Sequence, residues 1–155
     1  MVRIAIGTLA FAVVAACSSA PTAQTSQQKM VGKWTCATDT DNIVISGVFD
    51  YRADGLATSS SKIEVDAGAV KISLTSDADS TWGFNADGTM TEKVTAMKLT
   101  SAKMGGQDMD KDMVDSLVQP MIDGVVGESS TTTVTFGENS FVSTTEDGIV
   151  TTCER

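Results

Sequence analysis

The sequence predicts a mainly β fold: an antiparallel meander that forms a closed or half-open barrel, with one amphipathic helix inserted near residues 108–126. Three observations predict it. Aromatic-bearing segments end repeatedly in Asp-Gly or Glu-Asn pairs, which are typical of tight turns between strands. Apolar and polar residues alternate along most of the chain, as in half-buried strands. In one segment only, the apolar residues recur at the spacing of a helix.

The predicted turns divide the domain into hairpins. Asp-Gly pairs occupy positions 54–55, 87–88 and 147–148, and Glu138-Asn139 follows a further aromatic segment. Asp-Gly suits a hairpin because the tight turn needs a residue with positive φ. The copies are irregular, which favours a meander over a repeat protein. We expect about eight or nine strands.

The strands follow in order between these turns. Residues 62–66 and 70–74 alternate, with a turn between them, and are expected to place Ile63, Val65, Val70, Ile72 and Leu74 on the inner face. Residues 88–102 read as strand, and three more segments complete the meander at 130–136, 140–145 and 148–153.

The helix is predicted over residues 108–126, with Asp108 as its cap. Two adjoining apolar stripes run along it: Met109, Met113, Leu117 and Met121, and Val114, Val118, Ile122 and Val125. Pro120 should kink the helix and Gly124 or Gly127 should end it. Gly105-Gly106 makes a flexible entry. Such a helix must cover an apolar face, either an open end or a side of the barrel.

The first residues read as an export signal rather than as part of the fold. Residues 1–16 combine Arg3, an apolar run and a small-residue end. That run is about eleven residues, whereas a membrane-spanning helix needs about 20. Residues 17–29 are polar and small and read as a flexible tether, so the folded domain is expected over 30–155.

The stretch Val14-Ala-Ala-Cys17 resembles the lipobox of bacterial lipoproteins. The resemblance implies cleavage before Cys17, attachment of diacylglycerol to its sulfur and acylation of the new amino group, for example with palmitate. Several acyl chains give stable anchoring where one gives only marginal binding. Ser18 after the cysteine implies transit to an outer membrane, where the protein would face the periplasm. A secreted protein with an ordinary thiol at this position is the alternative.

Cys36 and Cys153 are the remaining two of three cysteines. An even pair in an exported chain favours a disulfide, which would place the first strand beside the last. Free thiols or a redox centre are the competing interpretations, although no Cys-x-x-Cys spacing occurs.

The composition excludes several classes of function. Twenty acidic residues against 11 basic ones give a net charge of −9, which argues against nucleic acid as a partner. The chain has no histidine, so Ser-His-Asp and Cys-His catalytic groups cannot form. We therefore expect no enzyme activity and no cofactor.

Three motifs suggest ligands, and each has a simpler explanation. Asp108-x-Asp-x-Asp112 copies the start of a calcium loop but lacks its later ligands, and acids also suit a helix N-terminus. The methionines could bind copper, yet flexible thioethers fill cores more often. Asp77, Asp79 and Asp87 near Trp82 suggest a sugar site, although acids are common in turns. No metal site is predicted.

Gly32-Lys-Trp34 at the start of a meander resembles the lipocalin-like small β-barrels. The resemblance implies that Trp34 plugs the closed end beneath a cavity for an apolar ligand, and Arg155 is a candidate for the basic residue over this Trp. The chain departs from the pattern because its helix precedes the final strands. The candidate lining residues are Trp34, Phe49, Tyr51, Ile63, Val65, Ile72, Leu74, Trp82, Phe84, Met113 and Leu117.

Two functions remain open at this point. The first is a membrane-tethered envelope lipoprotein that binds a small apolar molecule or lipid, with the helix as a lid. The second is a non-catalytic scaffold or accessory protein with a filled barrel, which acts through its surface on an unknown partner. A cavity of about 300 Å³ or more with a few convergent polar groups would favour the first.

Overall fold

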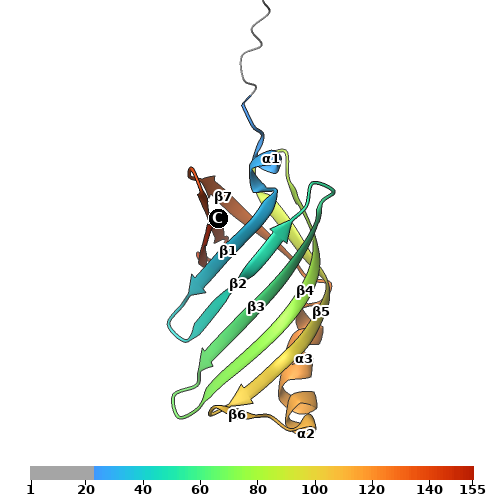
Figure 1. Cartoon of the computed structure of the whole chain (residues 1–155), viewed down its shortest axis with the longest axis vertical. Helices are drawn as coiled ribbons and strands as arrows, with labels where there is room; N and C mark the ends of the chain where they lie inside the picture. The colour runs from blue at the N-terminus through green and yellow to red at the C-terminus, as the bar shows by residue number, and fades with distance from the viewer. Residues whose placement is uncertain (1–22) are drawn as a thin grey trace, which may run out of the picture.

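Eight antiparallel strands close into a barrel in the computed structural model, which describes residues 23–155 (Figure 1). Each strand pairs with its neighbour, β9 pairs back with β1, and the barrel is therefore closed rather than half-open. The strands of the ring are β1 Gly32–Asp39, β2 Ile43–Tyr51, β3 Leu56–Asp66, β4 Lys71–Phe84, β5 Met90–Met104, β7 Ser129–Phe136, β8 Ser140–Thr145 and β9 Val150–Glu154.

The predicted disulfide is present, and it lies where the ring closes. Cys36 on β1 and Cys153 on β9 are paired in register, with their Cα atoms 4.0 Å apart. Both cysteines are buried in the barrel. The first and last strands are thus joined by a covalent bond as well as by their backbone ladder.

The three predicted Asp-Gly pairs all lie in turns between consecutive strands. In the β4–β5 turn, Gly88 has φ +87°, a conformation that costs little only for glycine. The Asp87 Oδ1 atom accepts a hydrogen bond from the Thr89 amide at 2.9 Å. The residues that predicted the meander therefore stabilise its turns directly.

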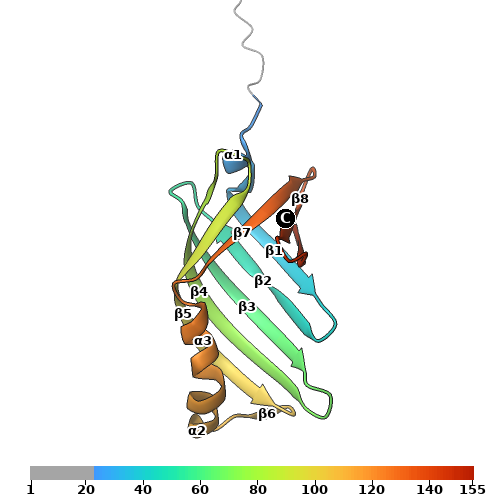
Figure 2. The ribbon, with the colours of Figure 1, turned by 180° about the vertical axis from the view of Figure 1, so that it is seen from behind.

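The strands differ in length, and this shapes the molecule. β4 and β5 have 14 and 15 residues, whereas β8 and β9 have 6 and 5. The long strands therefore run well beyond the short ones, and the helical segment packs against this extension (Figure 2). The pairing of β4 and β5 shifts register at two bulges, which bend a strand and increase its twist, and the hydroxyls of Thr95 and Thr100 each donate to a β4 carbonyl at 3.0 Å.

Aromatic side chains fill the barrel end that lies beneath the short helix α1 (Ser26–Met30). Trp34 is 2% exposed, and its Nε1 atom donates to the Met30 carbonyl at 2.7 Å. The Arg155 guanidinium lies 4.3 Å from the Trp34 ring centroid. The predicted plug and its basic partner therefore both occur at this end, which is closed. The cluster also contains Tyr51, Trp82, Met90, Phe141 and the disulfide.

The helical segment has three parts: α2 (Lys111–Met113), the π-helical turn η1 (Val114–Val118) and α3 (Gln119–Val125). Val118 and Ile122 pack against Leu74 of β4 and Ala102 of β5 in a second apolar cluster. Ile63 and Ile72 border the same cluster. The helix therefore covers the inner apolar face of the strand extension, as expected of an inserted helix.

The helix differs from prediction in its start and in its outer face. Asp110, not Asp108, caps it by accepting from the Met113 amide at 2.9 Å, while Asp108 belongs to the short strand β6 (Gln107–Asp108). The π turn adds a residue before Pro120, whose ring cannot fit a regular helix interior. Leu117, within the π turn, and Met121, in α3, are 51% and 58% exposed. The inward position predicted for Leu117 is wrong.

Gly105-Gly106 is a tight turn rather than a flexible entry. Both residues have positive φ, and Met104 pairs directly with Gln107 across them. The Gly105 amide also donates to the Lys71 carbonyl at 2.9 Å. The segment that precedes the helix is therefore fixed to the sheet by hydrogen bonds.

Candidate functional site

Two adjoining cavities lie inside the barrel, between the aromatic plug and the helix. One has a volume of about 230 Å³ and the other about 380 Å³. Four residues line both: Ile45, Phe49, Glu92 and Ser130. The smaller cavity reaches toward the disulfide, and the larger one reaches Val125 and Glu128 at the junction of α3 and β7. The interior is thus partly open instead of filled.

Glu92 lies where the two cavities meet. It follows Met90 by two residues on β5, and both side chains point inward because alternate residues of a strand share a face. Its Oε1 atom accepts a hydrogen bond from Ser80 Oγ at 2.6 Å, and its Oε2 atom accepts from Tyr51 Oη at 3.1 Å. Within residues 23–155, Glu92 makes no ion pair.

Tyr51 contributes a neutral hydroxyl to this interior. Burial raises its pKa well above the usual value of 10.0, and the nearby Glu92 charge and their hydrogen bond raise it further. The phenol therefore remains protonated at neutral pH and serves as a donor. Its ring packs edge-on against Trp82 and so connects the carboxylate to the aromatic plug.

Hydroxyl groups line much of the remaining cavity wall. Thr38 and Thr151, on β1 and β9, share a hydrogen bond at 2.5 Å. The Thr132 hydroxyl on β7 is buried, and the described part of the chain gives it no hydrogen-bond partner. An unsatisfied buried polar group costs about 1–3 kcal/mol, so a bound ligand that pairs with Thr132 would recover that energy. Other hydroxyl residues of the wall are Ser59, Ser61, Ser80, Ser129, Ser130, Ser143 and Thr145.

The structure distributes the predicted lining residues over four regions. Phe49 and Tyr51 line a cavity, and Trp34, Trp82 and Phe84 belong to the aromatic plug. Ile63, Ile72 and Leu74 pack beneath the helix, and Met113 is half-buried at its start. Val65 lies beside Ile72 in a groove near the β1–β2 turn. The lining that the structure adds is mainly polar: Glu92 and the hydroxyl residues.

Glu92 was missed because an acidic residue in a strand is usually solvated. Strand alternation was the available signal, since it places Glu92 on the same face as Met90 and Val94. The sequence alone does not show which of the two faces is the inner one. That assignment needs the packing of Met90 against the plug.

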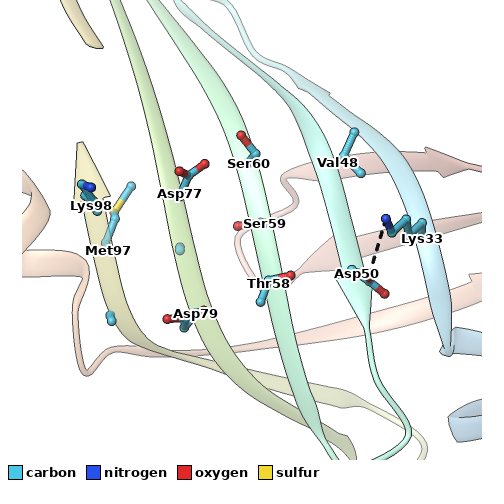
Figure 3. A pocket seen from close by; sticks show the side chains of 12 residues that line it. Lys33, Val48, Asp50, Thr58, Ser59, Ser60, Asp77, Asp79, Met97 and Lys98 are labelled. Carbon is cyan, nitrogen blue, oxygen red and sulfur yellow. Dashed lines mark ion pairs between the residues drawn. The ribbon is translucent and has the colours of Figure 1, made fainter. Parts of the chain in front are cut away.

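A larger hollow, of about 540 Å³, lies on the outer face of strands β1 to β5 (Figure 3). Its charged residues are Lys33, Asp50, Asp77, Asp79 and Lys98. One ion pair crosses it, from Lys33 Nζ to Asp50 Oδ2 at 4.0 Å, and both side chains are exposed. Because the interior cavities are less open than this hollow and hold a few convergent polar groups, they are the stronger candidate for a binding site.

The motifs that suggested other ligands are separated by the fold. Asp77 and Asp79 lie on the outer face, whereas Trp82 is buried inside, so no sugar-binding group of acids and ring forms there. Asp110 serves as the helix cap. Over residues 23–155, no group of three or more His, Cys, Asp or Glu side chains could hold a metal ion. The same range contains no helix with the length and apolar character to cross a membrane.

Comparison with protein-family models and with curated proteins finds no match for this chain. The fold therefore rests on the structure alone: a closed, eight-stranded antiparallel barrel with a Trp plug, consistent with a lipocalin-like barrel.

Proposed function

We propose that this protein binds a small molecule inside its barrel and is tethered to a membrane of the cell envelope by lipid at Cys17. The observation that carries the binding proposal is the pair of adjoining cavities, lined by both apolar and hydroxyl side chains. Their volumes fall near the lower end of the range for small-molecule sites, about 300–1,000 Å³. The interior is accordingly suited to a compact ligand.

The junction of α3 and β7 is the proposed entrance. The larger cavity reaches Val125, Glu128 and Ser129 there, at the end of the helix. The opposite end is closed by Trp34 and α1. A ligand would then enter beside the helix and stop at the aromatic plug.

Native mass spectrometry of the protein from its own host tests the binding proposal. We expect a co-purifying small molecule, or uptake of an apolar probe such as N-phenyl-naphthylamine with a gain in fluorescence. A Phe49→Trp variant, which narrows both cavities, should weaken probe uptake, and Val48→Trp on the outer face should not. Absence of any bound molecule together with no uptake would refute the proposal and favour the surface scaffold.

The lipid anchor is supported by the lipobox resemblance, and Cys17 lies outside the described residues. The disulfide adds support because such bonds persist in oxidising compartments, such as the bacterial periplasm. Ser18 favours the outer membrane, with the barrel facing the periplasm. Cys17→Ser should release a soluble protein or leave an uncut precursor, as judged by fractionation and intact mass. An unchanged membrane fraction with mature mass would contradict the anchor.

We also propose that the protein is a binding protein rather than an enzyme. Of the two acids that line the larger cavity, Glu92 lies where the two cavities meet and Glu128 lies at the entrance, whereas glycoside hydrolysis uses two carboxylates that flank the scissile bond. With no histidine in the chain, the usual proton shuttle is also missing.

A further inference from the structure

Glu92 sets a chemical requirement on whatever occupies the interior. It is the one acidic side chain that lines both cavities, and no lysine or arginine among the described residues lines either. A buried or half-buried carboxylate without a cation bears a desolvation cost. The hydroxyls of Ser80 and Tyr51 offset part of that cost.

The carboxylate still has unused capacity to accept hydrogen bonds. An ionised carboxylate offers about four lone-pair sites, and two are taken here. The unpartnered Thr132 hydroxyl lies in the wall of the same cavity. Thr132 pairs with Met90, and Ser130 pairs with Glu92, across the β5–β7 ladder, so these hydroxyls neighbour the carboxylate along one face. A ligand with several N–H donors could donate to the free lone pairs of the Glu92 carboxylate and to the Thr132 hydroxyl oxygen.

The apolar part of the wall lies beside this polar group. Phe49 and Ile45 line both cavities, and Met97 and Val94 extend the apolar wall of the larger one. An aromatic face beside a carboxylate favours a cation, because both attract positive charge. Glu128 at the entrance and the net charge of −9 raise the local concentration of cations.

We propose, building on the interior binding site above, that its ligand is a small organic cation: a protonated amine on an apolar chain or ring. The ammonium group pairs with Glu92, and the apolar part packs against Phe49 and Ile45. Ser80 and Tyr51 hold the carboxylate in place from the protein side. This class differs from a fatty acid, whose carboxylate would be repelled by Glu92.

Displacement of N-phenyl-naphthylamine tests the ligand class on the full chain. Cys17→Ser is introduced so that no attached acyl chain competes for the interior. The competitors are hexylamine, hexanol and hexanoate, which share one apolar chain and differ in the head group. Hexylamine should displace the probe at concentrations about 10- to 100-fold lower than hexanol, as expected for a charge-assisted hydrogen bond. Hexanoate should be the weakest competitor.

Two variants test whether Glu92 causes the preference for hexylamine over hexanol. Glu92→Gln keeps the side-chain shape and should remove the preference for hexylamine over hexanol, while hexanol binding stays unchanged. Glu154→Gln is the matched control, because it makes the same change in charge on an exposed residue of β9. It should leave the preference intact. Unfolding midpoints measured for both variants check that each is folded.

The outcomes separate this inference from the proposal on which it rests. Uptake of the probe with equal displacement by hexylamine and hexanol would overturn the cation proposal and leave interior binding standing. A preference for hexylamine that survives Glu92→Gln would also overturn it. No uptake of the probe and no binding of any competitor would refute interior binding itself.

Discussion

Reduction of the Cys36–Cys153 disulfide should destabilise the protein by about 5 kcal/mol. The two cysteines are 117 positions apart in the sequence and lie opposite one another on β1 and β9. The bond therefore restricts nearly the whole domain in the unfolded state. On the chain-entropy model, a loop of this length is worth about 5 kcal/mol at 25 °C.

This magnitude is large against the whole stability of a domain, which is about 5–15 kcal/mol. The reduced protein should consequently lose between a third of its stability and nearly all of it. Packing changes contribute little, because the reduced protein keeps both sulfur atoms in the buried cluster. Loss of the covalent link is thus the main difference between the oxidised and reduced proteins.

Urea unfolding of a Cys17→Ser protein, with and without reductant, measures the effect. The Cys17 substitution removes the third thiol and prevents exchange. A Cys36→Ala, Cys153→Ala double variant should resemble the reduced protein, with a small additional loss from the missing sulfurs. Oxidised and reduced proteins with free energies of unfolding within about 1 kcal/mol of each other would refute the chain-entropy argument.

Three further predictions concern the strands, the interior and the helix. Gly47→Ala should lower the free energy of unfolding by about 1–3 kcal/mol, because a Cβ there would lie 2.6 Å from the Ser60 carbonyl oxygen. Gly83→Ala, which has open space around the added Cβ, should be neutral or slightly stabilising in the same urea assay. Tyr51 is the one tyrosine of the chain, and because its pKa is raised, tyrosinate absorbance should be absent at pH 10 in the folded protein and present at that pH in urea. The free energy of unfolding should fall as the pH rises from about 10 toward the pKa of the folded protein. A titration of the folded protein at the ordinary tyrosine pKa would contradict the burial argument. Ile122→Ala should lower the free energy of unfolding by about 2–4 kcal/mol because Ile122 is 7% exposed. Met121→Ala, at a site that is 58% exposed, should shift the unfolding midpoint little. Equal losses of stability in the two variants would mean that the helix packs against the sheet by its other face.

Sequence patterns predicted the strands better than they predicted the site. Strand alternation and Asp-Gly turns predicted the meander correctly because both signals are local and depend on the backbone geometry of a few residues. The cysteine pair predicted that the ends of the domain meet, and the β1–β9 ladder confirms it. The Gly32-Lys-Trp34 resemblance predicted a plug, and Arg155 does lie over Trp34.

The helix shows where periodicity alone failed. Two apolar stripes were predicted, and the structure buries them unevenly: Val118 and Ile122 are buried, whereas Leu117 and Met121 are exposed. The segment is also not one regular helix, because residues 114–118 form a π-helical turn before Pro120. Periodicity groups the apolar residues into adjoining stripes but does not show which stripe faces the sheet, and Leu117 is 51% exposed.

By itself, the sequence determined the strand order, the turns, the disulfide and the acidic, histidine-free chemistry. Only the tertiary structure decided that the barrel closes, that cavities remain between plug and helix, and that Glu92 lies among hydroxyl groups inside. The physical reason is that alternation divides a strand into two faces but does not label them. Which face points into the barrel is decided by contacts such as the Tyr51–Glu92 hydrogen bond, which joins residues 41 positions apart and forms only once the sheet has curled.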